Sequence, residues 1–98
     1  MGLFFKSDPV STSEQLVKSA EEAVRRNEAY LSSMKDSRKQ AKQNGNYQRT
    51  AKNYRNNLGN NEVGTVYDAN VWSAERNLKK AKEDLKKAKE RLAAAKKK

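Results

Sequence analysis

The clearest alternation of apolar and polar positions lies in the last third of the chain. Leucine or valine recurs every seven residues, and alanine recurs with the same period three residues further on. A seven-residue period places both rows on one face of a helix and is typical of a coiled-coil seam. The sequence therefore predicts a heptad helix over residues 70–96. The leucine row is Val71, Leu78, Leu85 and Leu92, and the alanine row is Ala74, Ala81, Ala88 and Ala95.

A second amphipathic segment lies nearer the amino terminus. From Glu14 to about Gln43, apolar residues recur in steps of three and four or their multiples, which predicts a helix over residues 14–43. Asn27 falls on this seam, where it either specifies the helix register or stays hydrated at the edge of the stripe. The stripe consists of Val17, Ala20, Val24, Leu31, Met34 and Ala41, and Leu16, Ala23 and Tyr30 widen it.

The segment before this helix is predicted to be a flexible arm over residues 1–10. Asp8-Pro9 interrupts the chain there, because the residue before a proline avoids the helical conformation. The arm contains a short apolar cluster, Leu3-Phe4-Phe5. Ser11 and Glu14, or Thr12 and Gln15, then have the spacing of a capping box, which predicts a helix start at this point.

The connection between the two helices begins at Asn44-Gly45-Asn46, residues that tolerate the left-handed conformation at helix ends. Tyr47, Ala51, Tyr54 and Leu58 then repeat at helical spacing, which predicts a short helix over residues 46–58. Residues 59–67 are rich in glycine and asparagine and are predicted to form a loop. A brief strand over Val63–Tyr67 is the alternative, and its pairing partner is not evident from the sequence.

The two long helices predict an all-α, antiparallel, coiled-coil-like helical hairpin with a short third helix in the connection, residues 11–98 forming one domain. At 1.5 Å per residue the helices are about 45 and 40 Å long, so they can pack along their whole length. Tyr47, Tyr54 and Trp72 are expected to close the core at the connected end. Alanine layers bury little apolar area, so we expect a marginal monomer that self-associates or binds a larger complex.

The contact surface for such a partner is predicted on the heptad faces. Trp72 has two interpretations, a partner anchor or a core residue, and the second is favoured because large aromatic residues dominate small cores. The candidate interface residues are Val71, Leu78, Leu85, Leu92, Val17, Val24, Leu31 and Trp72.

Composition removes most of the chemistry of catalysis. The chain has no cysteine and no histidine, so thiolate nucleophiles and the commonest general base are missing. Gly59 and Gly64-Thr65 lack the lysine of a nucleotide-binding loop, and the carboxylates are expected on solvated faces among lysine and arginine. The sequence predicts no enzymatic activity, no cofactor, no metal site and no small-molecule substrate.

The net charge of +10 is unevenly distributed and points to an anionic partner. Residues 35–58 carry +6 and residues 71–98 carry +7, whereas residues 1–34 carry −1 and 59–70 carry −2. Tyr47 and Tyr54 lie among the first group of cations and either stack on bases or belong to the apolar stripe. The candidate anion or nucleic-acid contacts are Arg38, Lys39, Lys42, Arg49, Lys52, Arg55, Lys79, Lys82, Lys86 and Lys89.

The sequence as a whole predicts a non-enzymatic helical interaction module, a structural or adaptor component of a larger assembly. The alternative is a protein that binds nucleic acid without sequence specificity through its basic helix faces. Docking on a membrane surface through Leu3-Phe4-Phe5 is the weakest interpretation, because one short apolar patch anchors marginally. A cytoplasmic location is expected, since the sequence contains no apolar run of signal-peptide or membrane-spanning length.

Overall fold

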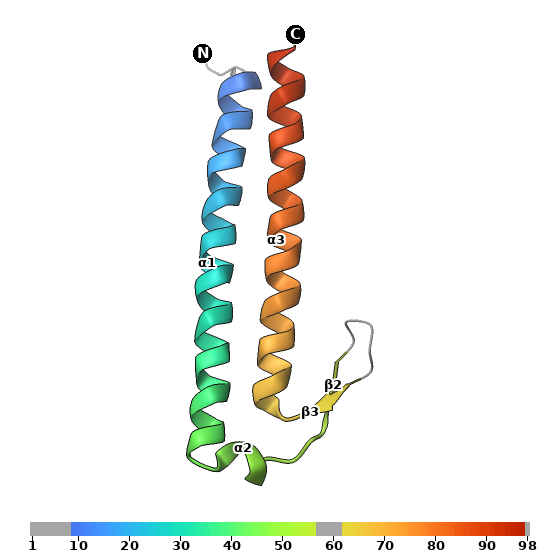
Figure 1. Ribbon diagram of the computed structural model, residues 1–98. Coiled ribbons are helices and arrows are strands. Elements are labelled where there is room, and N and C mark those ends of the chain that lie inside the picture. Colours follow the sequence, from blue (N-terminus) through green and yellow to red (C-terminus); the bar gives the residue numbers. More distant parts are fainter. Residues whose placement is uncertain (1–8, 57–61, 98) are drawn as a thin grey trace, which may run out of the picture.

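The protein is a helical hairpin. The computed structural model describes residues 9–56 and 62–97. Two long helices, α1 (Pro9–Gln43) and α3 (Val66–Lys96), lie side by side and run antiparallel (Figure 1). The molecule measures 61 × 25 × 19 Å, so its length is set by the helices and its thickness by two helix diameters. The predicted all-α antiparallel hairpin is therefore confirmed.

Helix α1 begins earlier than its sequence predicts. It includes Pro9 and Val10, which were assigned to the arm, and the serine and threonine of the predicted capping boxes lie inside it. Proline suits the first helical turn, because its backbone torsion is already helical and its missing N–H has no acceptor there. The prediction that residues 9 and 10 belong to the arm is therefore wrong. Residues 1–8 lie outside the part that the structure describes.

The end of α1 agrees with the prediction. Gly45 has a φ of 84°, in the left-handed region that favours glycine, and turns the chain two residues after Gln43. The helix that follows, α2 (Asn46–Arg49), is only one turn long. Thr50 is extended and donates its Oγ1 hydroxyl to the carbonyl of Asn46 at 2.7 Å, so the helix ends there.

The predicted helix over 46–58 is therefore wrong beyond Arg49, as far as the described residues extend. Strand β2 (Tyr54–Arg55) pairs antiparallel with β3 (Val63–Gly64), Tyr54 lying opposite Gly64 and Arg55 opposite Val63. The backbone N–H of Asn56 extends the pairing by donating to the carbonyl of Glu62 at 2.6 Å. The strand considered at Val63 thus has Tyr54–Arg55 as its partner. Residues 57–61 lie outside the described part of the chain.

Helix α3 begins at Val66, four residues before the predicted start, and its first turn is held by a capping box. The Thr65 hydroxyl accepts from the backbone N–H of Tyr67, and the Asp68 carboxylate accepts from the backbone N–H of Thr65. These bonds satisfy backbone donors that a helix leaves unpaired at its start. The other end of α3, at Lys96, is where the heptad pattern predicts it.

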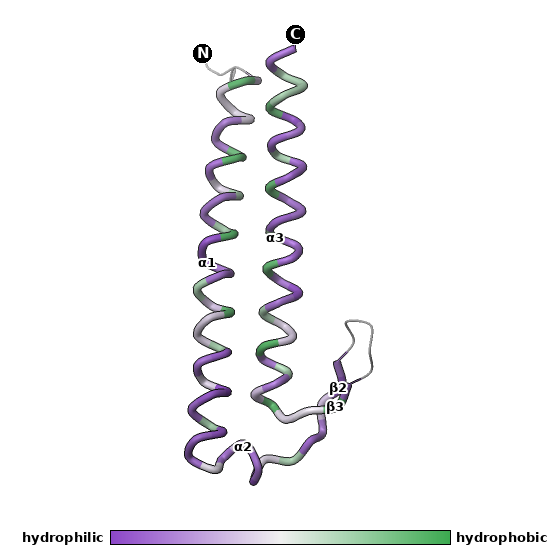
Figure 2. The backbone as a smooth tube through the Cα atoms, in the orientation of Figure 1, coloured by the Kyte–Doolittle hydropathy of each residue, from purple (hydrophilic) through white to green (hydrophobic). Residues whose placement is uncertain are grey.

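The core lies between the two long helices, on the sides where their hydrophobic positions face each other (Figure 2). The alanine row is its deepest layer, and Ala74 is 0% exposed. In the leucine row Val71 is buried, whereas Leu78, Leu85 and Leu92 are only half-buried. Because alanine lets the helices approach closely, the larger leucine side chains lie at the edge of the contact. The buried apolar residues are Ala41, Val71, Trp72, Ala74, Ala81 and Ala88.

Candidate protein-interaction surface

The contact between α1 and α3 leaves much apolar surface accessible. Within α1 only Ala41 is buried, although the apolar stripe runs along the whole helix. Val17, Val24 and Leu31 are half-buried, while Leu16 and Tyr30 are 44% and 50% exposed. One face of α1 is therefore only partly covered by α3.

A groove of about 610 Å³ lies along this incompletely covered face. Its apolar lining comes from Leu16, Ala20 and Ala23 of α1 and from Ala81 and Ala88 of α3. Because alanine side chains are small, they do not fill the groove, which stays open to solvent. The remaining lining residues are polar or charged, namely Ser19, Asn27, Asn77, Lys80, Asp84, Lys87 and Arg91. We call this feature the alanine groove.

Asn27 lies in this groove, among residues of both helices. Its side-chain Nδ2 donates to the backbone carbonyl of Ala23 at 2.7 Å, one turn earlier in the same helix. The side chain is half-buried. The amide nitrogen of Asn27 is thus hydrogen-bonded within α1.

A second hollow of about 440 Å³ lies elsewhere along the hairpin. Leu31 and Leu78 form its apolar part, and charged side chains surround them. The charged residues are Glu75, Lys79, Lys82, Glu83 and Lys86. Lysine and glutamate stems can cover apolar surface while their charged ends stay in water, so these side chains can partly cover Leu31 and Leu78.

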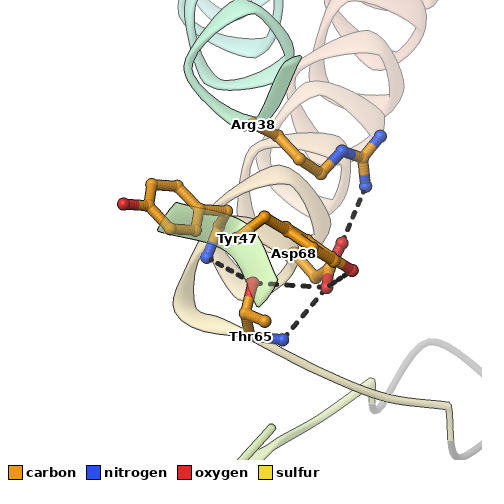
Figure 3. Close-up of polar contacts among 5 residues, drawn as sticks. Arg38, Tyr47, Thr65 and Asp68 are labelled. Atoms are coloured by element: carbon orange, nitrogen blue, oxygen red, sulfur yellow. Dashed lines mark hydrogen bonds and ion pairs between the residues drawn. The ribbon is translucent and has the colours of Figure 1, made fainter. Parts of the chain in front are cut away.

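At the connected end of the hairpin, Asp68 is the centre of a polar cluster (Figure 3). Its Oδ1 accepts a hydrogen bond from Arg38 Nη1 at 3.1 Å, and its Oδ2 accepts from the Tyr47 hydroxyl at 2.6 Å. The backbone N–H and the hydroxyl of Thr65 also donate to Oδ2, at 3.0 and 3.4 Å. The cluster joins α1, α2 and α3 through one carboxylate, whose side chain is 9% exposed.

The surroundings of Asp68 shift the ionisation of two groups. Burial by itself would raise the pKa of Asp68, but hydrogen bonds from Tyr47, Thr65 and Arg38, together with the Arg38 charge, hold this pKa below its usual value. The hydrogen bond to Asp68 raises the pKa of Tyr47, and burial acts in the same direction. The charged Asp68 carboxylate and the neutral Tyr47 phenol are thus the favoured ionisation states. Both suit a hydrogen bond that holds the helices together.

Tyr47 has further contacts that tie it to the fold. Its ring lies 6.5 Å from the Tyr67 ring, centroid to centroid, and Lys42 Nζ lies 4.9 Å from the Tyr47 centroid. The sequence predicted that Tyr47 and Tyr54 either stack on bases or belong to the apolar stripe. The structure places Tyr47 in the Asp68 cluster and leaves Tyr54, 44% exposed, on the surface. The expectation that Tyr54 closes the core is therefore wrong, because its segment forms a strand and not a helix.

The predicted interface residues are brought together, but within the chain. Val71 and Trp72 are buried, which agrees with the core interpretation of Trp72. The other six, Leu78, Leu85, Leu92, Val17, Val24 and Leu31, are half-buried along the contact of the two helices. On α1 the better exposed large apolar residues are Leu16 and Tyr30, which the sequence placed at the margin of the stripe.

The predicted anion contacts fall into two groups. Three already contact groups of the chain itself: Arg38 binds Asp68, Lys42 lies over Tyr47, and Arg49 donates to Asn46 Oδ1 at 2.6 Å. The others are exposed, and on α3 they follow one another at intervals of three and four residues. These exposed residues are Lys39, Lys52 and Arg55, and on α3 Lys79, Lys82, Lys86 and Lys89. We call the last four the lysine stripe.

Protein-family models, curated protein sequences and solved structures contain no match to this chain. Its function is therefore argued from its own geometry. Across residues 9–56 and 62–97, no three acidic side chains gather as they would around a metal ion. None of the described helices combines the length and the apolar character needed to cross a bilayer.

The Asp68 cluster is the feature that sequence reasoning missed. Arg38 was predicted to bind an anion, and the anion it contacts is a carboxylate of the same chain. The available signal was Thr65-x-x-Asp68, the spacing of a capping box, in a segment predicted to be a loop. The contacts of Arg38 and Tyr47 with Asp68 had no local signal, since they span 30 and 21 residues.

Proposed function

We propose that this chain is a non-enzymatic helical interaction module, in which the hairpin is a rigid support and its incompletely covered face binds a protein partner. The observation that supports this most directly is the exposure of Leu16 and Tyr30 beside a seam that is otherwise half-buried. They lie fourteen residues apart, four turns along one face of α1. An apolar face of this length, rimmed by polar residues, is typical of an interaction surface.

The Asp68 cluster supports the same proposal in another way. A two-helix unit has a small core, and its relative helix positions depend on few contacts. The Arg38 and Tyr47 bonds to Asp68 hold the connected end, so that the two helices present a preformed surface. A preformed surface loses less conformational entropy when it binds.

Site-specific photo-crosslinking in the native host tests this function. A photoreactive benzoyl-phenylalanine at position 30 should give one adduct of defined mass, whether with another protein or with a second copy of this chain. The same group at position 29, the exposed neighbour that points away from this face, is the matched control. If positions 16 and 30 give no adduct, or give the same adducts as position 29, the proposal is wrong.

The second candidate function is nonspecific nucleic-acid binding. The observation that favours it is the lysine stripe, whose four cations follow one side of α3 at spacings of three, four and three residues. Such a stripe can neutralise successive phosphates without reading bases. The acidic neighbours Glu83 and Glu90 reduce this potential.

A salt series separates the two functions. If the lysine stripe binds a duplex, replacing its four lysines by glutamine should reduce the log-log salt slope by about 3 to 4 units. Replacing Lys18, Lys35, Lys96 and Lys97, which are equal in number and also exposed, is the control. A wild-type chain that does not bind duplex or single strands at low salt would exclude this candidate.

A further inference from the structure

The two sides of the hairpin differ in how their charges are matched, and the register of the helices shows this. Arg38 is bonded to Asp68, and Leu31 and Glu75, each seven residues further from the connection, line the same hollow. A step of one heptad along α1 therefore corresponds to a step of one heptad along α3. Residues of α1 and α3 that are equally many positions from Arg38 and from Asp68 therefore lie at the same height along the hairpin.

On the side of Glu75 the charges of the helices are complementary. Along α1, residues 21, 28 and 35 are glutamate, glutamate and lysine; along α3, residues 89, 82 and 75 are lysine, lysine and glutamate. In the register above, each of these positions is offset along the helix axis by four residues, about 6 Å, from a position of opposite sign on the other helix. The sign changes in both helices at the same level. This side therefore carries charges of both signs on both helices.

The alanine groove lies on the other side, and its charges are not matched. Lys80, Lys87 and Arg91 stand on its α3 rim with one carboxylate, Asp84. The α1 residues that line the groove in the described structure are apolar or uncharged. The cationic rim thus has no acidic counterpart on α1, while the floor beneath it is apolar.

The dimensions of the groove suit a helix. Its lining runs from Leu16 to Asn27 on α1 and from Asn77 to Arg91 on α3. At 1.5 Å per residue these spans are about 17 and 21 Å, the length of three to four helical turns. An amphipathic helix places an apolar residue at every third or fourth position into such a groove.

We propose that the alanine groove binds an amphipathic α-helix of another protein whose apolar stripe is flanked by glutamate or aspartate. Its stripe covers Leu16 and the alanines, and its carboxylates meet Lys80, Lys87 and Arg91. This inference rests on the proposed interaction function and adds the place and the chemistry of the partner.

A second copy of this chain fits the groove less well. Its α3 would bring a second set of cations against Lys80 and Lys87, and like charges at short range repel. Beside Leu16, Ala23 and Tyr30 its α1 offers Ser19, Arg26 and Asn27, and the nearby Glu22 is paired with Arg26 of the same helix at 3.7 Å. Charge complementarity therefore selects a partner of different sequence.

The test uses the full chain and two synthetic 18-residue helical peptides with the same leucine stripe. In one peptide glutamate flanks the stripe, and in the other lysine does. Fluorescence anisotropy should show that the glutamate peptide binds at least about tenfold more tightly, because opposite charges attract and like charges repel across the rim. Equal affinity of the two peptides would overturn the proposal.

Matched variants locate the binding. Lys87→Glu reverses a charge on the groove rim, whereas Lys86→Glu makes the same change on its neighbour in the other hollow. Lys87→Glu should weaken binding of the glutamate peptide by about fivefold or more, and Lys86→Glu by less than about twofold. Ala23→Glu on the groove floor, compared with Ala29→Glu on the exposed back of α1, should show the same contrast. Far-UV circular dichroism verifies that each variant keeps its helix content.

The outcomes separate this proposal from the general function. Crosslinks at position 30 without binding of the glutamate peptide would overturn the acidic-helix proposal and leave the interaction function standing. A single-stranded oligonucleotide that binds in a Lys87-dependent manner, when the peptide does not, would also overturn it. Self-association abolished by Ala23→Glu would identify a second copy as the occupant, which contradicts the proposal.

Discussion

Arg38 and Asp68, 30 residues apart in the chain, form the ion pair that joins the last turns of α1 to the first turn of α3. Their atoms Nη1 and Oδ1 are 3.1 Å apart, and the carboxylate is buried. The same carboxylate caps α3 and accepts from Tyr47. One side chain thus connects the start of one helix to the end of the other.

Removing this carboxylate should destabilise the hairpin strongly. Asp68→Ala leaves Arg38, the Tyr47 hydroxyl and the Thr65 N–H without their acceptor, and we expect a loss of about 2–4 kcal/mol. Urea unfolding followed by circular dichroism measures it. Asp36→Ala removes an exposed carboxylate of α1 and should change stability by less than about 0.5 kcal/mol. Similar values for the two variants would contradict the role assigned to Asp68.

The stability that Asp68 contributes should depend on acid pH. Its pKa in the folded protein lies below the ordinary value of 3.8, so folding favours the charged form. The contribution is therefore fully present above that value and is lost as the pH falls through the lower, folded pKa. The stability difference between the wild type and Asp68→Asn should be constant near neutral pH and shrink below about pH 4. A difference that grows on acidification would show the opposite sign of shift.

Gly64 is required by the position of Asp68. A Cβ at residue 64 would lie 2.5 Å from Oδ2, 2.7 Å from Cβ and 2.8 Å from Cγ of Asp68, so the strand or the helix start would have to move. Gly64→Ala should cost about 1–3 kcal/mol, as overpacking does. In an Asp68→Gly background the three contacting atoms are absent, and most of this cost should disappear.

Gly45 provides the control for this double-mutant cycle. A Cβ there meets no atom within 4 Å, but the φ of 84° strains any other residue. Gly45→Ala should cost about 1–2 kcal/mol in both backgrounds, because the strain is local. A Gly64→Ala cost that is also independent of residue 68 would mean that the clash with Asp68 does not decide it.

The alanine row should tolerate enlargement poorly at its most buried member, Ala74. Ala74 is 0% exposed between the helices, so Ala74→Leu should separate them and cost about 1–3 kcal/mol. Ala94→Leu makes the same substitution at an exposed position of α3 and should change stability by less than about 0.5 kcal/mol. Thermal unfolding compares the two. A neutral Ala74→Leu would show that the helices are not in close contact at this level.

The two long helices and their antiparallel arrangement were predictable from sequence. A heptad of leucine and alanine is a local pattern, and its strength over residues 70–96 is why the end of α3 was predicted correctly. The starts of both helices were misplaced for a different reason. Pro9 and Thr65 lie in segments that look irregular, and only cap chemistry reveals that a helix begins there.

The connection was predicted less well, because its structure depends on distant partners. Tyr47 and Tyr54 have helical spacing, yet one contacts Asp68 and the other lies in a strand opposite Gly64. A two-residue strand has no sequence period of its own. Its existence depends on pairing with Val63–Gly64, which local propensity does not describe.

The apolar and charged periods of the chain determined by themselves that it forms two amphipathic helices able to pair, because a period of seven is a property of neighbouring turns. The tertiary structure alone decided which row faces inward, and it placed alanine deeper than leucine because small side chains permit the closest approach of two backbones. It also decided that Asp68 gathers Arg38 and Tyr47, and that Leu16 borders an open groove. These relationships join residues far apart in the chain, so they exist only once the hairpin has closed.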